Sequence, residues 1–344
     1  MPQRPILYFD IEDRQHELRD SVAPDDFVLR RRDTKVDFPQ SALAYCADLM
    51  AERVLYTAHG ADLPAVFGAP FLYSAQLESA RHVVSVPFER LGELDHLADG
   101  HTVCQPTLIF SPGRTGSTLL ARLLSACGAP CASEPDMLSQ VCRFVREDRL
   151  RMGFGMEVPL LRACLGAIFA AIGPSAFIKL RSHCNARPLA LVEAAPGCSV
   201  VFLLRRLNDW ALSRHRAFAE PPESVALVLR HTIDALDKLT GAGVPLKVLW
   251  FEDLRRDPAS ALVACLPLAK LRRGVDVAAI RRVMASDSQE GTGLAREAVA
   301  QAPVDDGFLA AFERVWPEAR ASAMWCPATE DLVAGMWDLP RIAA

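Results

Sequence analysis

The stretch PTLIFSPGRTGSTLLARLLSAC, residues 106–127, decides the fold of this chain. It opens with Thr107 to Phe110, an apolar run of the length expected for a buried strand. A loop of Gly, Pro and polar residues follows at positions 111–116. The apolar residues that then repeat at helical spacing are Leu119, Leu120, Leu123, Leu124 and Cys127. The stretch therefore predicts a strand, a loop and an amphipathic helix, in that order.

Three later apolar runs continue this alternation of strand and helix. They span Ala176 to Leu180, Cys198 to Leu204 and Lys247 to Phe251, and a helical segment follows each of them. Such alternation builds a parallel sheet with helices on its faces, joined by right-handed crossovers. We therefore expect an α/β domain over residues 106–344, with three α/β/α layers, a central parallel sheet and a P-loop-like phosphate loop.

Residues 1–105 carry no motif that indicates a function, and we treat them as an N-terminal extension of unknown role. Ile6 to Phe9 has the pattern of a strand, and the run from Ser41 to Leu55 has the pattern of a helix. A plain scaffold, a structural cap, an oligomer contact and part of an acceptor pocket all remain open for this region.

The composition is that of a folded protein. Of the 344 residues, 51% are hydrophobic and 23% are charged, which argues against wholesale disorder. The formal net charge of -4 indicates no broad basic face, so we expect no nucleic acid partner, and any anion site must be local. The ten cysteines form no C-x-x-C pair, so we expect reduced structural thiols and no metal.

Neither candidate apolar segment has the properties of a membrane anchor. Met1 to Gln15 mixes acidic and basic residues into its only apolar run, unlike a signal peptide. Leu160 to Gly173 contains Arg162 and is too short to cross a bilayer, so it predicts a buried helix. We therefore expect a cytoplasmic protein without a membrane span.

The loop before the predicted helix suits a phosphate, because backbone N–H groups and the helix dipole favour an anion there. Gly116 lets the backbone approach closely, Ser117 and Thr118 are expected to cap the helix and donate hydroxyls, and Arg114 supplies positive charge. A kinase-type P-loop, G-x-x-x-x-G-K-[ST], fits poorly, because its first Gly would fall on Ser111 and its Lys on Ser117.

The run from Arg114 to Leu120, RTGSTLL, resembles the 5'-phosphosulfate loop of sulfotransferases that use 3'-phosphoadenylyl sulfate (PAPS). A second family signature is a strand that ends in Arg, with a Ser eight residues later, and Val201 to Arg205 with Ser213 reproduces it. Asn208 is expected to cap the helix that carries Ser213. The likeness covers about Pro106 to Gly293 and indicates a bacterial-type member of the P-loop sulfotransferase fold. The residues that it implies for cofactor binding are Arg114, Thr115, Gly116, Ser117, Thr118, Arg205, Ser213 and Ser288.

The resemblance also implies candidate catalytic residues beside Arg114. Glu134, in Ser133-Glu-Pro135, is the candidate general base, although a carboxylate that stabilises a helix beginning near Asp136 is an equal alternative. Lys179, at the end of a predicted strand, is expected near the transferring group. His183 is a reserve base. The residues of a late loop that could close over the nucleotide are Ser286, Ser288 and Gln289.

These features predict a sulfotransferase that moves a sulfuryl group from PAPS to a hydroxyl or amine, releasing 3'-phosphoadenosine 5'-phosphate (PAP). The acceptor is a small molecule, a carbohydrate or a peptide that the sequence does not identify, and the oligomeric state stays open. One alternative is a regulatory module that binds PAPS or PAP without turnover. A P-loop nucleotide kinase is the other.

Overall fold

The structure, a computed structural model, describes residues 3–15, 21–32, 38–39, 41–94, 105–146, 155–266, 275–287, 295–302, 307–321 and 323–337. The chain forms two compact units. The first unit is Met1–Thr107 with Pro130–Cys198, and the second unit is Leu108–Ala129 with Ser199–Ala344. The functional boundary expected at residue 105 stays a prediction.

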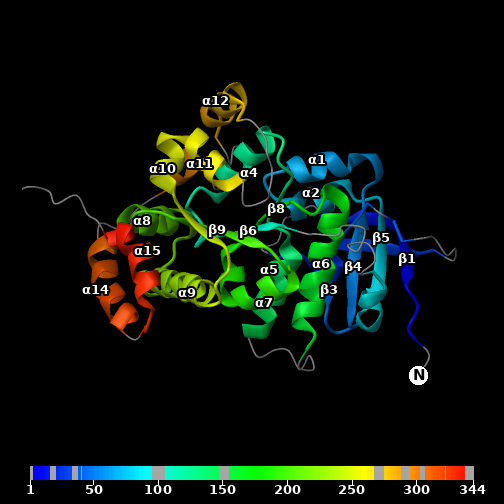
Figure 1. Cartoon of the computed structure of the whole chain (residues 1–344). Coiled ribbons are helices and arrows are strands. Elements are labelled where there is room, and N and C mark those ends of the chain that lie inside the picture. Colours follow the sequence, from blue (N-terminus) through cyan, green and yellow to red (C-terminus); the bar gives the residue numbers. More distant parts are fainter. Residues whose placement is uncertain are drawn as a thin grey trace, which may run out of the picture. The chain divides into compact units, whose positions relative to one another are not determined.

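The N-terminal part of the first unit is an antiparallel sheet, in which every neighbouring pair of strands runs in opposite directions. Its strands, in sheet order, are β2 (Phe27–Arg31), β1 (Leu7–Arg14), β5 (His82–Pro87), β4 (Arg53–Ala58) and β3 (Ala42–Asp48). Figure 1 shows β1, β3, β4 and β5 in blue to cyan. The strand predicted over Ile6 to Phe9 is confirmed, because β1 begins at Leu7.

The helix predicted over Ser41 to Leu55 is wrong, because this run forms the hairpin of β3 and β4. All side chains from Ala42 to Ala47 are buried, so the strand is apolar on both faces and lacks the alternation that marks a half-buried strand. The Asp48 carboxylate accepts the N–H groups of Met50 and Ala51, at 3.1 and 2.9 Å, and so stabilises the turn.

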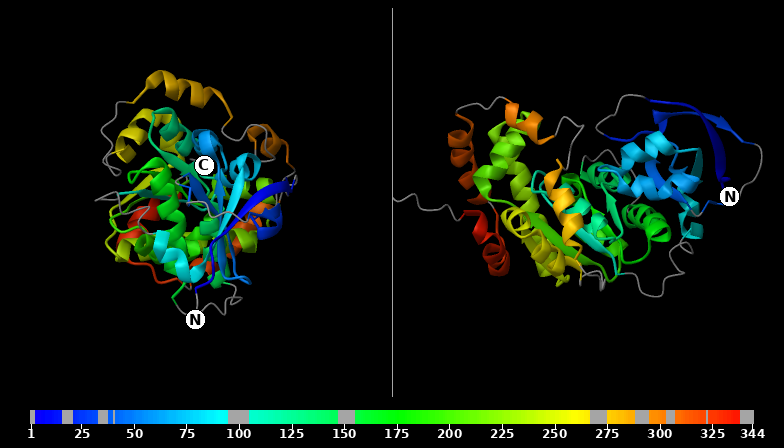
Figure 2. Two further views of the ribbon diagram at one scale, coloured as in Figure 1. Left: turned by 90° about the vertical axis from the view of Figure 1, so that its right-hand side faces the viewer. Right: turned by 90° about the horizontal axis from the view of Figure 1, so that it is seen from above.

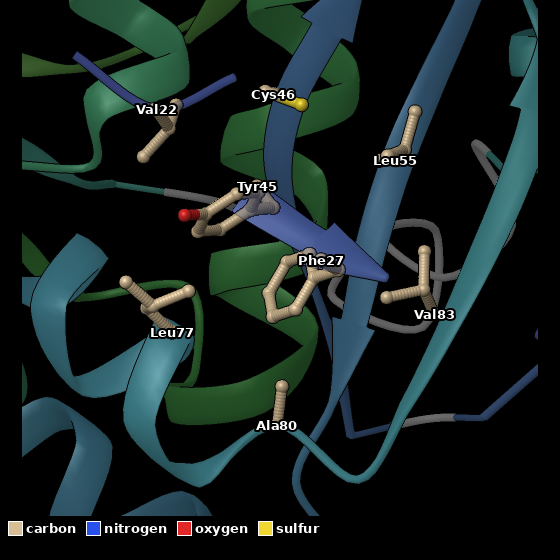
Figure 3. Packing of buried hydrophobic residues seen from close by; sticks show 8 residues of the cluster. All are labelled: Val22, Phe27, Tyr45, Cys46, Leu55, Leu77, Ala80 and Val83. Carbon is tan, nitrogen blue, oxygen red and sulfur yellow. The ribbon is translucent and has the colours of Figure 1, made fainter. Parts of the chain in front are cut away.

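Helices α5 and α6 pack against β3. The helices of the first unit are α1 (Leu63–Gly68), α2 (Leu72–Ser79), α5 (Asp136–Arg146), α6 (Glu157–Ile172) and α7 (Pro188–Ala194), with 3-10 turns η1 (Pro24–Asp26), η2 (Gly60–Asp62), η3 (Phe88–Leu94) and η4 (Ser182–Ala186). The buried helix expected from Leu160 to Gly173 is confirmed by α6. Figure 3 shows a core cluster of Val22, Phe27, Tyr45, Cys46, Leu55, Leu77, Ala80 and Val83. The Tyr45 hydroxyl donates to Asp26 Oδ2 at 2.7 Å.

The second sheet is parallel, and its strand order is β10-β9-β6-β8-β7. Its strands are β6 (Thr107–Phe110), β7 (Cys131–Ser133), β8 (Phe177–Lys179), β9 (Ser199–Leu204) and β10 (Leu246–Trp250). The predicted α/β class with a central parallel sheet is confirmed. All four predicted strands are present, and β7 was missed because three residues carry too little pattern.

Helices flank the strands of the second unit. They are α4 (Ser117–Ala126), α8 (Leu207–Phe218), α9 (Pro222–Gly241), α10 (Phe251–Arg256), α11 (Pro258–Cys265), α12 (Val277–Ala285), α13 (Arg296–Gln301), α14 (Phe308–Ala321) and α15 (Pro327–Trp337). The long helix α9 packs against α14 and α15, coloured orange and red in the right-hand view of Figure 2. Within the described ranges, no helix combines the length and the apolar character needed to cross a membrane.

Candidate functional site

The loop between β6 and α4 has an unusual backbone. Gly113, Arg114 and Gly116 have φ angles of 77°, 59° and 81°, all in the left-handed region. This conformation strains a residue with a side chain, so Arg114 is held there by its surroundings. Successive turns of this kind point backbone N–H groups toward one side and form a concave site that suits an anion.

Gly116 is required at its position for two independent reasons. Its φ angle is left-handed, and a Cβ atom placed there would lie 2.5 Å from Cδ2 of Phe251, closer than carbon atoms can approach. Gly116 is also the N-cap residue of α4, which begins at Ser117 without a side-chain cap. The expectation that Ser117 and Thr118 cap this helix is therefore wrong, because both residues already lie in its first turn.

Helix α8 holds the loop in place through its side chains. Trp210 Nε1 donates to the carbonyl of Gly113 at 2.9 Å, and Arg214 Nη1 donates to the carbonyl of Pro112, also at 2.9 Å. Asn208 was expected to cap α8, but the helix already begins at Leu207 and its N-cap is Arg206. The Asn208 amide instead donates to Glu313 Oε1 at 3.1 Å.

Arg205 and Phe251 meet because parallel strands end at the same edge of a sheet. Leu204 and Trp250 are paired as the last residues of β9 and β10, so Arg205 and Phe251 follow side by side. The Arg205 guanidinium lies over the Phe251 ring, 4.5 Å from its centroid. This is a favourable cation–π contact.

Arg114, Arg205 and Ser213 come together although they are far apart in the sequence. Arg205 Nη1 donates to the carbonyl of Arg114 at 3.3 Å, and Arg114 Nε donates to Ser213 Oγ at 3.4 Å. Arg205 Nε is buried and has no hydrogen-bond partner among the described residues. A buried donor of this kind is costly unless a ligand or water satisfies it.

These three residues line a cavity of about 390 Å³ that lies wholly within the second unit, a typical size for a small-molecule pocket. Its charged lining residues are Arg114, Arg205, Arg216 and Arg255 together with Asp209 and Asp287. Gly116, Ser117 and Thr118 also line it, whereas Thr115 is fully buried and does not. The local excess of two positive charges contrasts with the net charge of -4 of the whole chain.

The electrostatics of the cavity favour an anion. Burial lowers the pKa of Arg114, and the nearby positive charge of Arg205 lowers it further. Burial also lowers the pKa of Arg205. Both groups stay protonated at neutral pH, because an arginine titrates far above it. The cavity therefore concentrates positive charge that a bound anion would neutralise.

Solved sulfotransferase structures are similar to this chain. A sulfotransferase domain from the curacin biosynthetic pathway matches with a TM-score of 0.40 and 14% identity, over 68% of this chain and 98% of that one. Mouse sulfotransferase SULT7A1, complexed with PAP, matches with a TM-score of 0.41 and 11% identity, over 72% and 94%. Sulfotransferase STF9 from Mycobacterium avium matches with a TM-score of 0.40 and 12% identity, over 69% and 81%. No family model and no curated protein sequence matches the chain. At these scores the likenesses carry no functional argument, which rests on the residues of the cavity.

Glu134 and Lys179 meet in the first unit because the parallel strands β7 and β8 end at the same edge of the sheet. Ser133 of β7 pairs with Lys179 of β8, so Glu134 directly follows the end of its strand. Lys179 Nζ donates to Glu134 Oε1 at 2.5 Å, and the Glu134 N–H donates to the carbonyl of Lys179 at 2.8 Å. Glu134 has a left-handed φ of 56°. The predicted helix start near Asp136 is confirmed by α5, but the Glu134 carboxylate contacts Lys179.

The remaining candidates do not lie together. Ser286 lines the cavity of the second unit, whereas Ser288 and Gln289 lie outside the described residues. His183 is exposed, on η4 of the first unit. Among the described residues, no group of three or more His, Cys, Asp or Glu side chains could hold a metal ion, and the described cysteines are free thiols.

Sequence reasoning missed two arginines of functional interest. Arg255 lines the cavity, and its guanidinium lies 5.9 Å from the centroid of the Phe251 ring. The available signal was the spacing of four residues from Phe251 to Arg255, because residues four apart on a helix share a face. Arg181 contacts Glu134, as described below, and its signal was the alternation of Lys179 and Arg181 along an extended segment.

Proposed function

We propose that this protein is a sulfotransferase that transfers a sulfuryl group from PAPS to a hydroxyl or amine of a small molecule, a carbohydrate or a peptide. One observation carries the proposal: Arg114 of the loop and Arg205 and Ser213 of the second sequence signature line the same cavity. The two signatures are 91 residues apart, from Arg114 to Arg205, and local sequence alone does not require them to meet.

The chemistry of the cavity fits an anion that carries charge at more than one place. The four lining arginines exceed the two lining aspartates, and the Arg205 Nε has no partner among the described residues. Arginine is well suited to phosphate, because its planar N–H groups match the oxygens in pairs. Gly116 and the first residues of α4 are proposed to supply backbone N–H groups for one anionic group, and Arg205 with Ser213 supplies donors for another.

In the proposed reaction PAPS supplies the sulfuryl group, and the protein contributes position and charge. Arg114 and the loop amides stabilise the negative charge that develops on the leaving phosphate. Glu134 is proposed to accept the proton of the acceptor, and Lys179 is proposed to polarise the group that is transferred. The role of Arg114 is tested by the turnover measurement below.

A nucleotide kinase is the less favoured function, because the position of its P-loop lysine holds Ser117. Ser117 is the first residue of α4 and lines the cavity, so no lysine ammonium is available from that position. A regulatory module that binds PAPS without turnover shares the same cavity and differs only in activity. Binding and turnover therefore have to be measured separately.

The binding test is a thermal-shift titration of the protein with PAP, ADP and ATP with magnesium. We expect PAP to raise the unfolding temperature far more than ADP, since a ligand at a hundred times its Kd stabilises by about 2.7 kcal/mol. R205A should abolish the shift. The matched control is R206A, because Arg206 is an exposed neighbour that does not line the cavity. Stabilisation by ATP with magnesium but not by PAP contradicts the proposal.

The turnover test measures the release of PAP from PAPS with a panel of phenols, alcohols, sugars and hydroxyl peptides. We expect R114A to lower kcat by on the order of a hundredfold, as in the loss of other charged donors at a transition state. PAP binding without release by the wild-type protein would support the regulatory module instead. An undiminished rate for R114A would exclude the role of this arginine.

A further inference from the structure

Four charged side chains form a chain of contacts in the first unit. Lys179 Nζ contacts Glu134 Oε1 at 2.5 Å, and Arg181 Nε lies 3.7 Å from Glu134 Oε2. Arg181 Nη1 donates to Asp136 Oδ1. The side chains of Lys179 and Asp136 are buried, with exposed fractions of 1% and 0%. The charges of the four side chains sum to zero, so the group is neutral as a whole although Lys179 and Asp136 are removed from water.

Asp136 is anchored by the N-terminal region. Its Oδ2 accepts hydrogen bonds from Ser21 Oγ and from the N–H of Val22, both at 2.9 Å. The side chain of Val22 belongs to the core cluster of Figure 3. The carboxylate that faces Arg181 is thus tied to a segment whose own position is set by packing in the core.

Aromatic residues of the same N-terminal region cover the two cations. The Lys179 ammonium lies 5.6 Å from the centroid of the Phe71 ring, and the Arg181 guanidinium lies 5.5 Å from that of Tyr73. Tyr73 in turn packs against the core cluster. These contacts restrict both cations, because a charge over a ring face is held there by the electrostatic field of the ring.

Arg181 connects the two carboxylates of this group. Its guanidinium faces two carboxylates at once, Glu134 through Nε and Asp136 through Nη1. A planar fork can do this, whereas an ammonium is a single point of charge. Glu134 also has a strained left-handed backbone, which persists only where several contacts determine the local structure.

We propose that Arg181 is a positioning residue that orients the Glu134 carboxylate against Lys179, with Asp136 as its fixed support. This inference rests on the proposed function, in which Glu134 and Lys179 take part in transfer. It also gives residues 1–105 a role, because Ser21, Val22, Phe71 and Tyr73 hold the ions that determine the position of Glu134.

The experiment compares kcat and KM for PAPS in the wild-type protein, R181K and R181Q, with the best acceptor of the panel above. R181K keeps the charge but loses the fork, and we expect kcat to fall about tenfold to a hundredfold, because small misplacements of a reacting group cost this much. KM for PAPS should change less than about twofold, since ground-state binding of PAPS is not the step affected. R181Q should lower kcat at least as much.

The matched control is R187K. Arg187 is also paired through its guanidinium fork in the same unit, but with the single carboxylate of Glu157, from whose oxygens Nε and Nη2 each lie 2.5 Å. We expect R187K to keep the wild-type kcat. The PAP-induced thermal shift of each variant shows whether it is folded, so R181K remains decisive where R181Q does not fold.

Failure of the proposed function and failure of the role of Arg181 give different results. A wild-type protein that neither binds PAP nor releases it from PAPS overturns the proposed function and this inference with it. A wild-type protein that turns over PAPS, with kcat of R181K within about twofold of it, overturns the inference alone. Equal losses of kcat in R181K and R187K, with lowered unfolding temperatures in both, mean a structural role only and also overturn it.

Discussion

Arg114 and Arg205 lie close together with like charges, partly removed from water. Burial and the charge of Arg205 lower the pKa of Arg114, which means that the charged form is disfavoured in this place. The two like charges repel each other, so an anion bound between them would stabilise both. At the scale of single residues, this repulsion is a physical reason for the proposal that the cavity binds an anion.

Gly116 offers a test of the loop geometry. G116A should lower the unfolding free energy by about 2 kcal/mol or more, because it combines a left-handed backbone with a collision against Phe251. It should also abolish PAP binding, since the loop must move to relieve the collision. Chemical denaturation and PAP titration measure the two effects.

The matched control for G116A is G243A. Gly243 has a similar φ of 66°, but a Cβ there meets nothing within 4 Å, so only the backbone cost of about 1 kcal/mol is expected. PAP binding should be unaffected. Equal destabilisation by both changes would mean that the contact with Phe251 contributes nothing.

At the scale of elements, α4 connects the loop to the segment that follows α12. Arg122 of α4 donates from Nη1 to the carbonyl of Asp287 at 2.6 Å and from Nη2 to Ser286 Oγ at 3.0 Å. Ser286 and Asp287 line the cavity, and α12 packs against α4. One side chain of the helix that begins at the loop therefore holds another part of the cavity wall.

Removal of this connection should weaken ligand binding. We expect R122A to raise the Kd for PAP about tenfold, which is the loss of one or two hydrogen bonds to a charged donor. Calorimetric titration with PAP measures the change. R281A, which removes an exposed arginine of α12, is the control and should bind PAP as the wild-type protein does. An unchanged Kd for R122A would show that the contact is not needed for binding.

At the scale of the whole molecule, stability should depend on pH through His59. This residue is fully buried after β4, where its ring nitrogens contact Ser79 Oγ at 3.0 Å and Thr57 Oγ1 at 2.9 Å. Burial lowers its pKa to about 4. The unfolded chain, with an ordinary histidine pKa of about 6.5, binds a proton at higher pH than the folded protein does.

The direction of the pH dependence follows from this difference between the folded and unfolded pKa values of His59. As pH falls from 7 to 5 the unfolded state is protonated first, so the folded state loses about 2 kcal/mol through His59. Other groups also titrate in this range, so the test is the difference between the wild-type protein and H59Q in chemical denaturation at both pH values. H59Q should lose about 2 kcal/mol less than the wild type. The exposed-histidine control H183Q should behave as the wild type, and equal slopes for all three proteins would contradict the assignment.

The sequence by itself predicted four of the five parallel strands, because each depends on a pattern within a few consecutive residues. It also supplied the candidates Arg114, Arg205 and Ser213, through the two short motifs that resemble those of a known family. Only the tertiary structure decided that Arg255 lines the cavity and that Arg181 contacts Glu134. It also decided that the run from Ser41 to Leu55 forms β3 and the start of β4, because an apolar stretch such as Ala42 to Ala47 suits a buried strand and a buried helix equally well. The physical reason is the same in each case: a side-chain contact between distant residues depends on which strands become neighbours and in which register, and no local pattern contains that information.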